Sequence, residues 1–208
     1  TLTGLRSQML ESWDGILTAH FWMANEKDSY LAFTDQGGGA LLEHSHALNL
    51  FLFFANELGQ GPAVQVEATV DWVDHESGRY DRESTLSITL NSGLIGEVKQ
   101  DLHTWPAIKE AEATFEHGAL VWTMGGDSDS VTYKNSSGQI VEKWNFPKTR
   151  PDDFKGEIGH LSELLSSPTL TSTLDLSHGL QVMEVALAAF DSSVTGQPVA
   201  PKPLKLNY

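Results

Sequence analysis

Residues 37 to 49 read Gly-Gly-Gly-Ala-Leu-Leu-Glu-His-Ser-His-Ala-Leu-Asn, and a mostly apolar run continues to Ala55. The glycine triplet opens a segment that we expect to be helical. That segment should end near Gly59-Gln60-Gly61-Pro62, because glycine and proline terminate helices. A helix that is apolar all round is a buried helix. The pattern therefore predicts one long buried helix over residues 37–59.

Polar side chains gather in the first turns of this predicted helix. Glu43 and His46 are three residues apart and would share one helix face, and Asn49 continues that line one turn later. A carboxylate, an imidazole and an amide in this arrangement suit proton-transfer chemistry. Two structural alternatives stay open. Glu43 could simply favour the positive end of a helix, and His46 could be a hydrogen-bonded core histidine.

The composition limits the class of protein. The chain has 208 residues and a formal net charge of −15, with 28 acidic and 13 basic residues. Such a surface repels phosphate backbones, so we expect no nucleic-acid partner. The chain lacks cysteine, which excludes disulfides and thiolate metal sites and is compatible with a cytoplasmic location.

The first residues and the apolar runs show whether the sequence has a signal peptide or a membrane span. No run approaches the roughly 20 apolar residues that span a bilayer, so we expect no membrane partner. The first residues lack the charged and apolar regions of a signal peptide. The chain begins with Thr1 rather than Met, which leaves a processed or truncated chain as an interpretation.

Hydrophobic periodicity predicts the remaining elements. Apolar spacing favours helices, and two-residue alternation favours strands joined in successive hairpins. The predicted elements are a helix at 2–11, strands at 16–24 and 64–72, a loop at 75–80, hairpins over 86–104, 111–123 and 131–144, helices at 154–165 and 175–193, and an extended arm at 201–208. This order predicts an α+β domain, with a large and mainly antiparallel open sheet and helices packed on one face.

Several catalytic motifs are absent from the sequence. No G-x-G-x-x-G follows a predicted strand, and there is no P-loop and no H-E-x-x-H pair. His44 and His46 would face different sides of a helix, so they make a poor metal pair. Ser45 lies outside any G-x-S-x-G setting. We therefore expect no metal site and no serine hydrolase.

The stretch 37–49 resembles the glycine-triplet, acid and histidine segment of the Gfo/Idh/MocA oxidoreductases. Other segments resemble further parts of the same family in the same order, so that the resemblance covers nearly the whole chain. They are 113–122, similar to a sheet segment, 157–161, similar to a late helix, and 175–189 with 195–199, similar to a closing helix and strand.

The resemblance implies a division of labour between two domains. In this family an N-terminal Rossmann domain binds NAD or NADP, and a C-terminal α+β domain binds substrate. Residues 1–208 resemble the second, substrate-binding and oligomerisation domain alone, with the Rossmann domain absent. The family's catalytic lysine lies in an E-K-P motif of the first domain, and Glu26-Lys27-Asp28 is not that motif. The fragment alone is therefore expected to be inactive.

The resemblance also implies roles for individual residues. His46 corresponds to the family's catalytic histidine, and Glu43 stands where many members have Asp. The implied reaction is NAD(P)-dependent oxidation of a sugar, cyclitol or related polyol derivative, with His46 assisting proton transfer and Glu43 orienting it. Asn49, where the family often has Asp, and Tyr30 are expected to contact substrate. His44 is expected to be exposed or at the substrate's edge, without a role.

Other functions remain open. The departures at Glu43 and Asn49 allow a non-catalytic relative that senses a dinucleotide or a sugar and acts through protein–protein contacts. A third interpretation is a domain that merely associates, since a sheet face without helices is a natural dimer surface. We accordingly expect a homo-oligomer formed through the open sheet face. His103 and Trp105, near a strand end, are expected to be packed or solvated.

Overall fold

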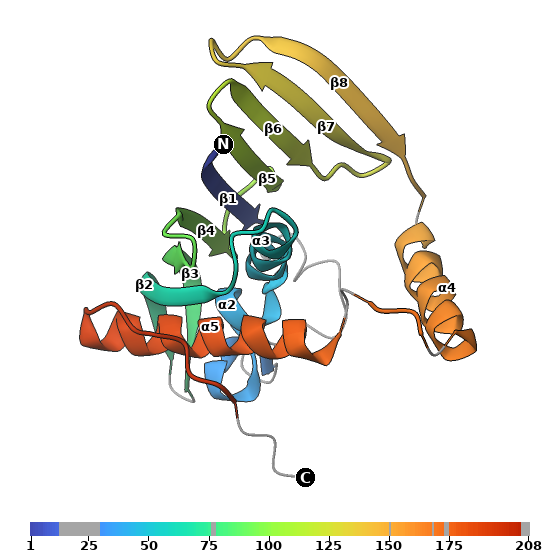
Figure 1. Cartoon of the computed structure of the whole chain (residues 1–208). Coiled ribbons are helices and arrows are strands. Elements are labelled where there is room, and N and C mark those ends of the chain that lie inside the picture. Colours follow the sequence, from blue (N-terminus) through green and yellow to red (C-terminus); the bar gives the residue numbers. More distant parts are fainter. Residues whose placement is uncertain (13–29, 76–77, 150, 168, 173–174, 205–208) are drawn as a thin grey trace.

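The computed structural model describes residues 1–12, 30–75, 78–149, 151–167, 169–172 and 175–204. Within these residues a single sheet has the strand order β2-β3-β4-β1-β5-β6-β7-β8 (Figure 1). Neighbouring strands are antiparallel except β1 and β4, which are parallel. The strands are β1 (Leu2–Leu10), β2 (Ala63–His75), β3 (Gly78–Leu90), β4 (Ile95–Asp101), β5 (Ile108–Phe115), β6 (Gly118–Thr123), β7 (Ser128–Asn135) and β8 (Ile140–Pro147).

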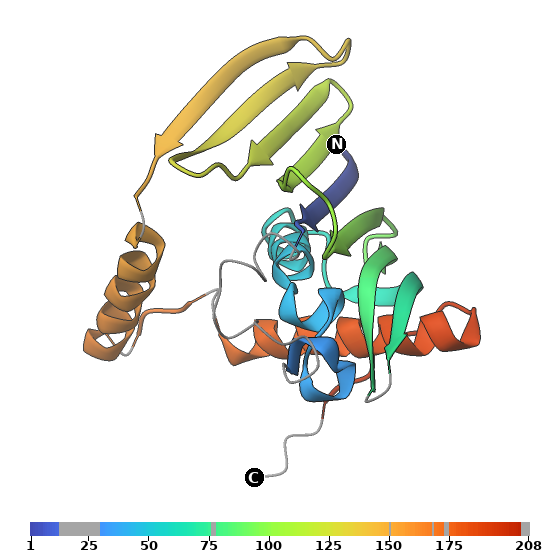
Figure 2. The ribbon, with the colours of Figure 1, turned by 180° about the vertical axis from the view of Figure 1, so that it is seen from behind.

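The described helices lie mainly beside the first half of the sheet. Two 3-10 turns, η3 and η4, precede the glycine triplet, and two helices follow it. The longest helix, α5, packs along β2, and α3 packs on β1, β4 and β5 (Figures 1 and 2). The helices are η3 (Tyr30–Ala32), η4 (Thr34–Gln36), α2 (Ala40–Glu43), α3 (His46–Glu57), α4 (Asp152–Ser166) and α5 (Leu176–Thr195).

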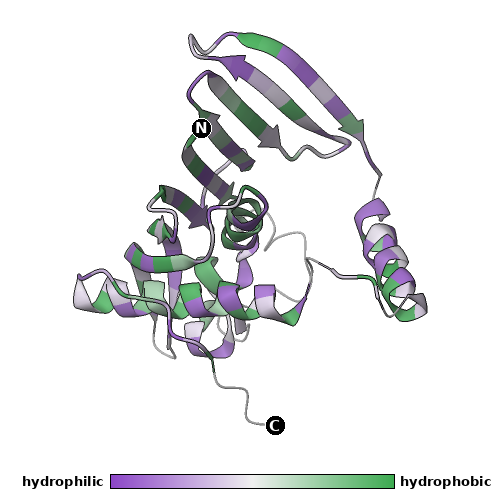
Figure 3. Ribbon diagram, viewed as in Figure 1, coloured by the Kyte–Doolittle hydropathy of each residue, from purple (hydrophilic) through white to green (hydrophobic). Residues whose placement is uncertain are grey.

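The hydrophobic core lies between the sheet and helices α3 and α5. Phe51 of α3 is fully buried, and a Cβ added to Gly96 of β4 would lie 2.4 Å from its ring, so glycine makes room for it. The mainly hydrophobic colour of α3 in Figure 3 matches this burial. The other buried apolar side chains of this core include Leu5, Met9, Leu41, Leu48, Leu52, Val66, Leu86, Ile88, Leu90, Val98, Val182, Val185 and Ala189.

The opposite face of the first five strands is polar. Arg6 of β1 forms ion pairs with Glu110 and Glu112 of β5, at 3.3 and 3.0 Å. On the neighbouring strands, Lys99 pairs with Glu83 at 3.0 Å. These cross-strand pairs stabilise the sheet only modestly, since they are partly solvated.

Helix α4 stands apart from α3 and α5 in both views of the ribbon (Figures 1 and 2). None of its residues is buried, and its apolar side chains Phe154, Ile158 and Leu161 are all more than half exposed. The Nε2 atom of His160 lies 2.7 Å from the Ser172 hydroxyl, which ties the helix to the segment that follows it.

The α+β fold class, the mainly antiparallel sheet and the predicted hairpins are confirmed. Both late helices are present as α4 and α5, and α5 begins at Leu176, after the N-cap residue Asp175, whose side chain accepts a hydrogen bond from the His178 N–H. The predicted strand at 16–24 lies outside the described residues. The predicted arm is irregular over 201–204, and its last four residues are likewise not described.

Three predictions about local structure are wrong. Residues 2–10 form strand β1 rather than a helix, because pairing with β4 and β5 overrides the helix-like spacing of the leucines. The loop predicted at 75–80 is shorter than expected, since β2 extends to His75 and β3 begins at Gly78. The single helix over 37–59 is two helices, α2 and α3, with a break at His44 and Ser45.

Candidate functional site

Two glycines of the triplet, Gly38 and Gly39, are required by the close approach of other groups, whereas Gly37 has open space and a φ of 94°. A Cβ added to Gly38 would lie 2.3 Å from the Tyr30 carbonyl oxygen, and this backbone cannot give way. Gly39 has a φ of 92°, and a Cβ there would lie 1.9 Å from Asp81 Oδ1. Any other residue at these positions would displace the segment that begins α2.

Asp81 of β3 lies beneath this turn and is fully buried. Its Oδ2 accepts hydrogen bonds from the Leu41 N–H at 2.7 Å and from the Ser84 hydroxyl at 3.0 Å, and its Oδ1 accepts one from the Thr34 hydroxyl at 3.4 Å. Burial raises the pKa of the Asp81 carboxyl to about 6, although these hydrogen bonds act in the opposite direction.

Gln100 of β4 joins the two helices on either side of the break. Its Oε1 accepts a hydrogen bond from the Leu48 N–H of α3 at 3.0 Å, and its Nε2 donates to the Ala40 carbonyl of α2 at 3.0 Å. Gln100 is fully buried, so these bonds satisfy an amide that would otherwise be costly to bury. Two strand side chains, Asp81 and Gln100, therefore hold α2 and α3 in place.

The structure places three of the predicted residues at this junction. His46 is the first residue of α3 and is exposed, so the alternative of a core histidine is wrong. Glu43 is the last residue of α2 and is half-buried. The Tyr30 side chain hydrogen-bonds Glu43, and its pKa is raised by burial and by this neighbour. The prediction that Glu43 and His46 share one face of a single helix is wrong, because the break separates them.

Asn49 forms an internal contact. Its Oδ1 accepts a hydrogen bond from His178 Nε2 of α5 at 3.0 Å. His178 is 8% exposed, and its backbone N–H donates to Asp175 at 3.0 Å. Asn49 therefore ties α3 to the first turn of α5, while its side chain remains exposed at the surface. Sequence reasoning missed His178, since nothing in the local pattern indicates a partner 129 residues away.

His44 was expected to be exposed, and that expectation is wrong. It is 7% exposed, and its Nε2 lies 3.8 Å from Glu11 Oε2, which Lys109 Nζ also contacts at 2.7 Å. Its ring centroid is 6.2 Å from that of His46. Burial lowers the pKa of the His44 imidazole to about 4, and the Glu11 charge opposes this only in part. His44 lies three residues after buried Leu41 and four residues before buried Leu48, so even a continuous helix would place it on their buried face.

One group of side chains in the described part of the chain has the spacing of metal ligands. His103 Nε2 lies 3.4 Å from Glu83 Oε2 and 3.5 Å from Asp101 Oδ2. Each carboxylate already has another partner, because Lys99 pairs with Glu83 and the Thr104 N–H and hydroxyl bond to Asp101. These contacts explain the cluster without a cation. Trp105 nearby is 78% exposed.

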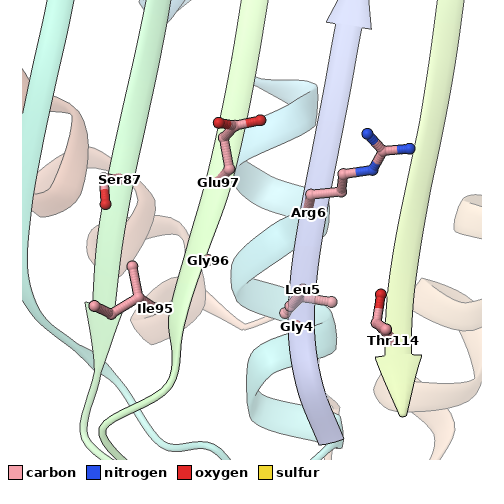
Figure 4. A pocket seen from close by; sticks show the side chains of 8 residues that line it. All are labelled: Gly4, Leu5, Arg6, Ser87, Ile95, Gly96, Glu97 and Thr114. Carbon is pink, nitrogen blue, oxygen red and sulfur yellow. The ribbon is translucent and has the colours of Figure 1, made fainter. Parts of the chain in front are cut away.

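A shallow depression of about 320 Å³ lies over strands β1, β3, β4 and β5 (Figure 4). Gly4 and Gly96 are among the residues that line it, and Arg6 and Glu97 stand on the neighbouring strands β1 and β4. The predicted residues Tyr30, Glu43, His46 and Asn49 are not among those that line it.

No family model and no curated protein matches the sequence. Among the described residues, no helix is both long and apolar enough to cross a membrane. Solved structures do match. Levoglucosan dehydrogenase in complex with NADH and levoglucosan has 15% sequence identity and a TM-score of 0.72, and the match covers 98% of this chain and 59% of that one.

Two other solved structures agree with this match. An NAD-binding oxidoreductase from Klebsiella pneumoniae has 14% identity and a TM-score of 0.68, with 97% of this chain and 59% of that one covered. An oxidoreductase from Agrobacterium radiobacter, in complex with NAD+, L-tartaric acid and magnesium, has 17% identity and a TM-score of 0.65, with 96% and 57% covered.

The chain thus spans a little under 60% of the length of these matched structures. At such low identity the likeness concerns the fold alone. The chain has the fold predicted from its sequence, that of the C-terminal domain of the Gfo/Idh/MocA oxidoreductases.

Proposed function

We propose that the chain is the substrate-binding and catalytic domain of an NAD(P)-dependent oxidoreductase that acts on a sugar, a cyclitol or a related polyol derivative. The observation that carries the proposal is the exposed His46 imidazole at the start of α3, on a segment held from below by Asp81 and Gln100. Rigid support of an accessible imidazole is what a proton-transfer site requires. The fold shared with solved oxidoreductases agrees with this proposal.

The proposed chemistry divides between this domain and a dinucleotide. NAD(P), when bound, would supply the acceptor for a hydride from a substrate carbinol carbon. The described residues contain no glycine-rich phosphate loop after a strand, so the dinucleotide would be bound mainly by a Rossmann domain elsewhere in the protein. His46 would accept the hydroxyl proton. Glu43, which hydrogen-bonds Tyr30, would orient the imidazole.

Substrate contacts would come from the same junction. The Tyr30 side chain is 47% exposed and lies beside Glu43, so it can present its ring or hydroxyl to a bound polyol. The Asn49 carbonyl is engaged by His178, which leaves its NH₂ group as the donor toward substrate. Residues 1–208 would form one domain of a cytoplasmic homo-oligomer joined through the open sheet face, and this domain alone would be inactive.

The test is substitution of His46 in the full-length protein. We expect His46→Ala to lower kcat by roughly 10²- to 10⁴-fold, with little change in KM or in the melting temperature. The control is His117→Ala, since His117 is an exposed histidine in the turn between β5 and β6. Unchanged turnover of a confirmed substrate by the His46 variant would remove this residue from the mechanism. Light scattering would test the oligomer, and a monomer would contradict it.

A non-catalytic relative that senses a dinucleotide or a sugar is the second candidate. The internal bonds of Glu43 with Tyr30 and of Asn49 with His178 favour it, because both polar side chains already have partners. Calorimetry and turnover assays on the full-length protein would separate the candidates. Dinucleotide or sugar binding without turnover would favour the sensor, and turnover that depends on His46 would favour the enzyme.

A further inference from the structure

We propose that Asp81 is the positioning residue for the junction between α2 and α3, acting as a helix cap that is supplied by strand β3 rather than by the helix's own sequence. Its importance for catalysis rests on the role proposed for His46. The capping interaction does not depend on the role of His46. The capping interaction and its importance for catalysis are therefore tested separately.

The first argument is the cap that α2 lacks. The residue before α2 is Gly39, which has no side chain to accept a hydrogen bond from the first-turn amides. In an ordinary N-cap, the capping side chain accepts a hydrogen bond from the second or third helical N–H. Here the second helical residue, Leu41, donates its N–H to Asp81 Oδ2 at 2.7 Å. Asp81 therefore makes the bond that a side chain at position 39 would ordinarily make.

The second argument is steric. The Asp81 carboxylate occupies the space where a side chain at position 39 would begin, since an added Cβ would lie 1.9 Å from Oδ1. Gly39 and the buried Asp81 therefore depend on each other. Glycine admits the carboxylate, and the carboxylate caps the helix that glycine cannot cap.

The third argument is the backbone of β3. Asp71 of β2 pairs with Glu83, and the next residue, Trp72, pairs with Asp81, so Arg82 is an extra residue in β3. Such a bulge changes which face of a sheet a side chain meets. In regular alternation Asp81 and Ser84, three residues apart, would face opposite sides. With the bulge they face the same side, and the Ser84 hydroxyl donates to Asp81 Oδ2 at 3.0 Å.

The surroundings of Asp81 leave its charge without a cationic partner among the groups that bond it. The carboxyl is faced by the Thr34 hydroxyl from η4, the Leu41 N–H from α2 and the Ser84 hydroxyl from β3. The adjacent Arg82 turns to the exposed carboxylate of Asp71. Because burial raises the pKa of Asp81 to about 6, its ionisation falls within a pH range in which the protein can be studied.

Nuclear magnetic resonance on the full chain with ¹⁵N-labelled leucine tests the proposal. We expect the Leu41 amide resonance to titrate with a midpoint near pH 6, because its N–H donates to the Asp81 carboxyl. In Asp81→Asn this titration should vanish, and Leu41 should exchange its hydrogen roughly tenfold faster or more, as for a lost bond to a charged group. Asp71→Asn is the control, since it removes an exposed carboxylate at the same bulge, in the strand pair next to that of Asp81, and the Leu41 titration should persist.

A second variant keeps the test decisive if Asp81→Asn does not fold. Ser84→Ala removes one hydrogen bond that lowers the pKa of Asp81, so the Leu41 midpoint should move to higher pH. A Leu41 amide that does not titrate in the parent chain, or a midpoint unaffected by Ser84→Ala, would overturn the proposal.

Its connection to function is measured in the full-length protein. Asp81→Asn should lower kcat more than it raises KM, because it leaves substrate-contacting side chains intact but loosens the segment that presents His46. His46→Ala should lower kcat by roughly 10²- to 10⁴-fold and leave the Leu41 titration unchanged. Failure of the catalytic proposal is therefore distinguishable from failure of the capping proposal.

Discussion

His44 and Asp81 should make opposite contributions to the pH dependence of stability. The pKa of the buried His44 imidazole is lowered from 6.5 to about 4. The unfolded chain therefore binds a proton at this residue more readily than the folded chain does between these values. The stability that His44 contributes is fully present above pH 6.5 and is lost as the pH falls through about 4. At about 1.4 kcal/mol per pH unit, the change is about 3 kcal/mol.

Asp81 acts with the reverse sign. Its pKa is raised from 3.8 to about 6, so the folded chain binds the proton more tightly than the unfolded chain does. Its stabilising contribution is present below pH 3.8 and is lost as the pH rises through about 6. The magnitude is again about 3 kcal/mol. Between about pH 4 and pH 6.5, the changes in unfolding free energy that His44 and Asp81 cause should therefore nearly cancel in the parent chain.

Single substitutions should expose each contribution. In Asp81→Asn, the free energy of unfolding should rise by about 2–3 kcal/mol more than in the parent between about pH 4 and pH 6.5. In His44→Gln, it should fall by a similar amount relative to the parent. Urea unfolding followed by circular dichroism at both pH values measures these differences, and exposed Asp71→Asn is the control. If all four proteins show the same pH dependence, the argument from burial is refuted.

Two further substitutions test the packing. Gly39→Ala should destabilise the protein by about 2 kcal/mol or more, through both its positive φ and the Asp81 clash, whereas Gly126→Ala, with nothing within 4 Å, should have little effect on the melting temperature. Phe51→Ala, which empties a fully buried site under α3, should cost about 3–5 kcal/mol in urea unfolding. The exposed Leu165→Ser on α4 should change stability by less than about 0.5 kcal/mol, and a larger loss would mean that α4 is covered in solution.

The candidate site was only partly predictable. The glycine triplet marks the segment because its residue types are unusual, and the exposure of His46 agrees with the functional interpretation. The relation between Glu43 and His46 was wrongly predicted, because the helix break depends on Gln100, more than fifty residues away from Leu48. The exposure of His44 was also wrongly predicted, although its spacing of three residues from Leu41 and four from Leu48 places it on their buried face.

The sequence by itself determined the strands, turns and helix ends that depend only on residues close together in the chain. Alternating residues and turn signals specify the hairpins of β3 with β4 and of β7 with β8, and Asp175 and Gly196 mark the ends of α5. Only the tertiary structure decided that residues 2–10 are a strand between β4 and β5, and that Asp81 caps α2. Both depend on hydrogen bonds between segments far apart in the chain, and such bonds leave no periodic pattern in the residues beside them.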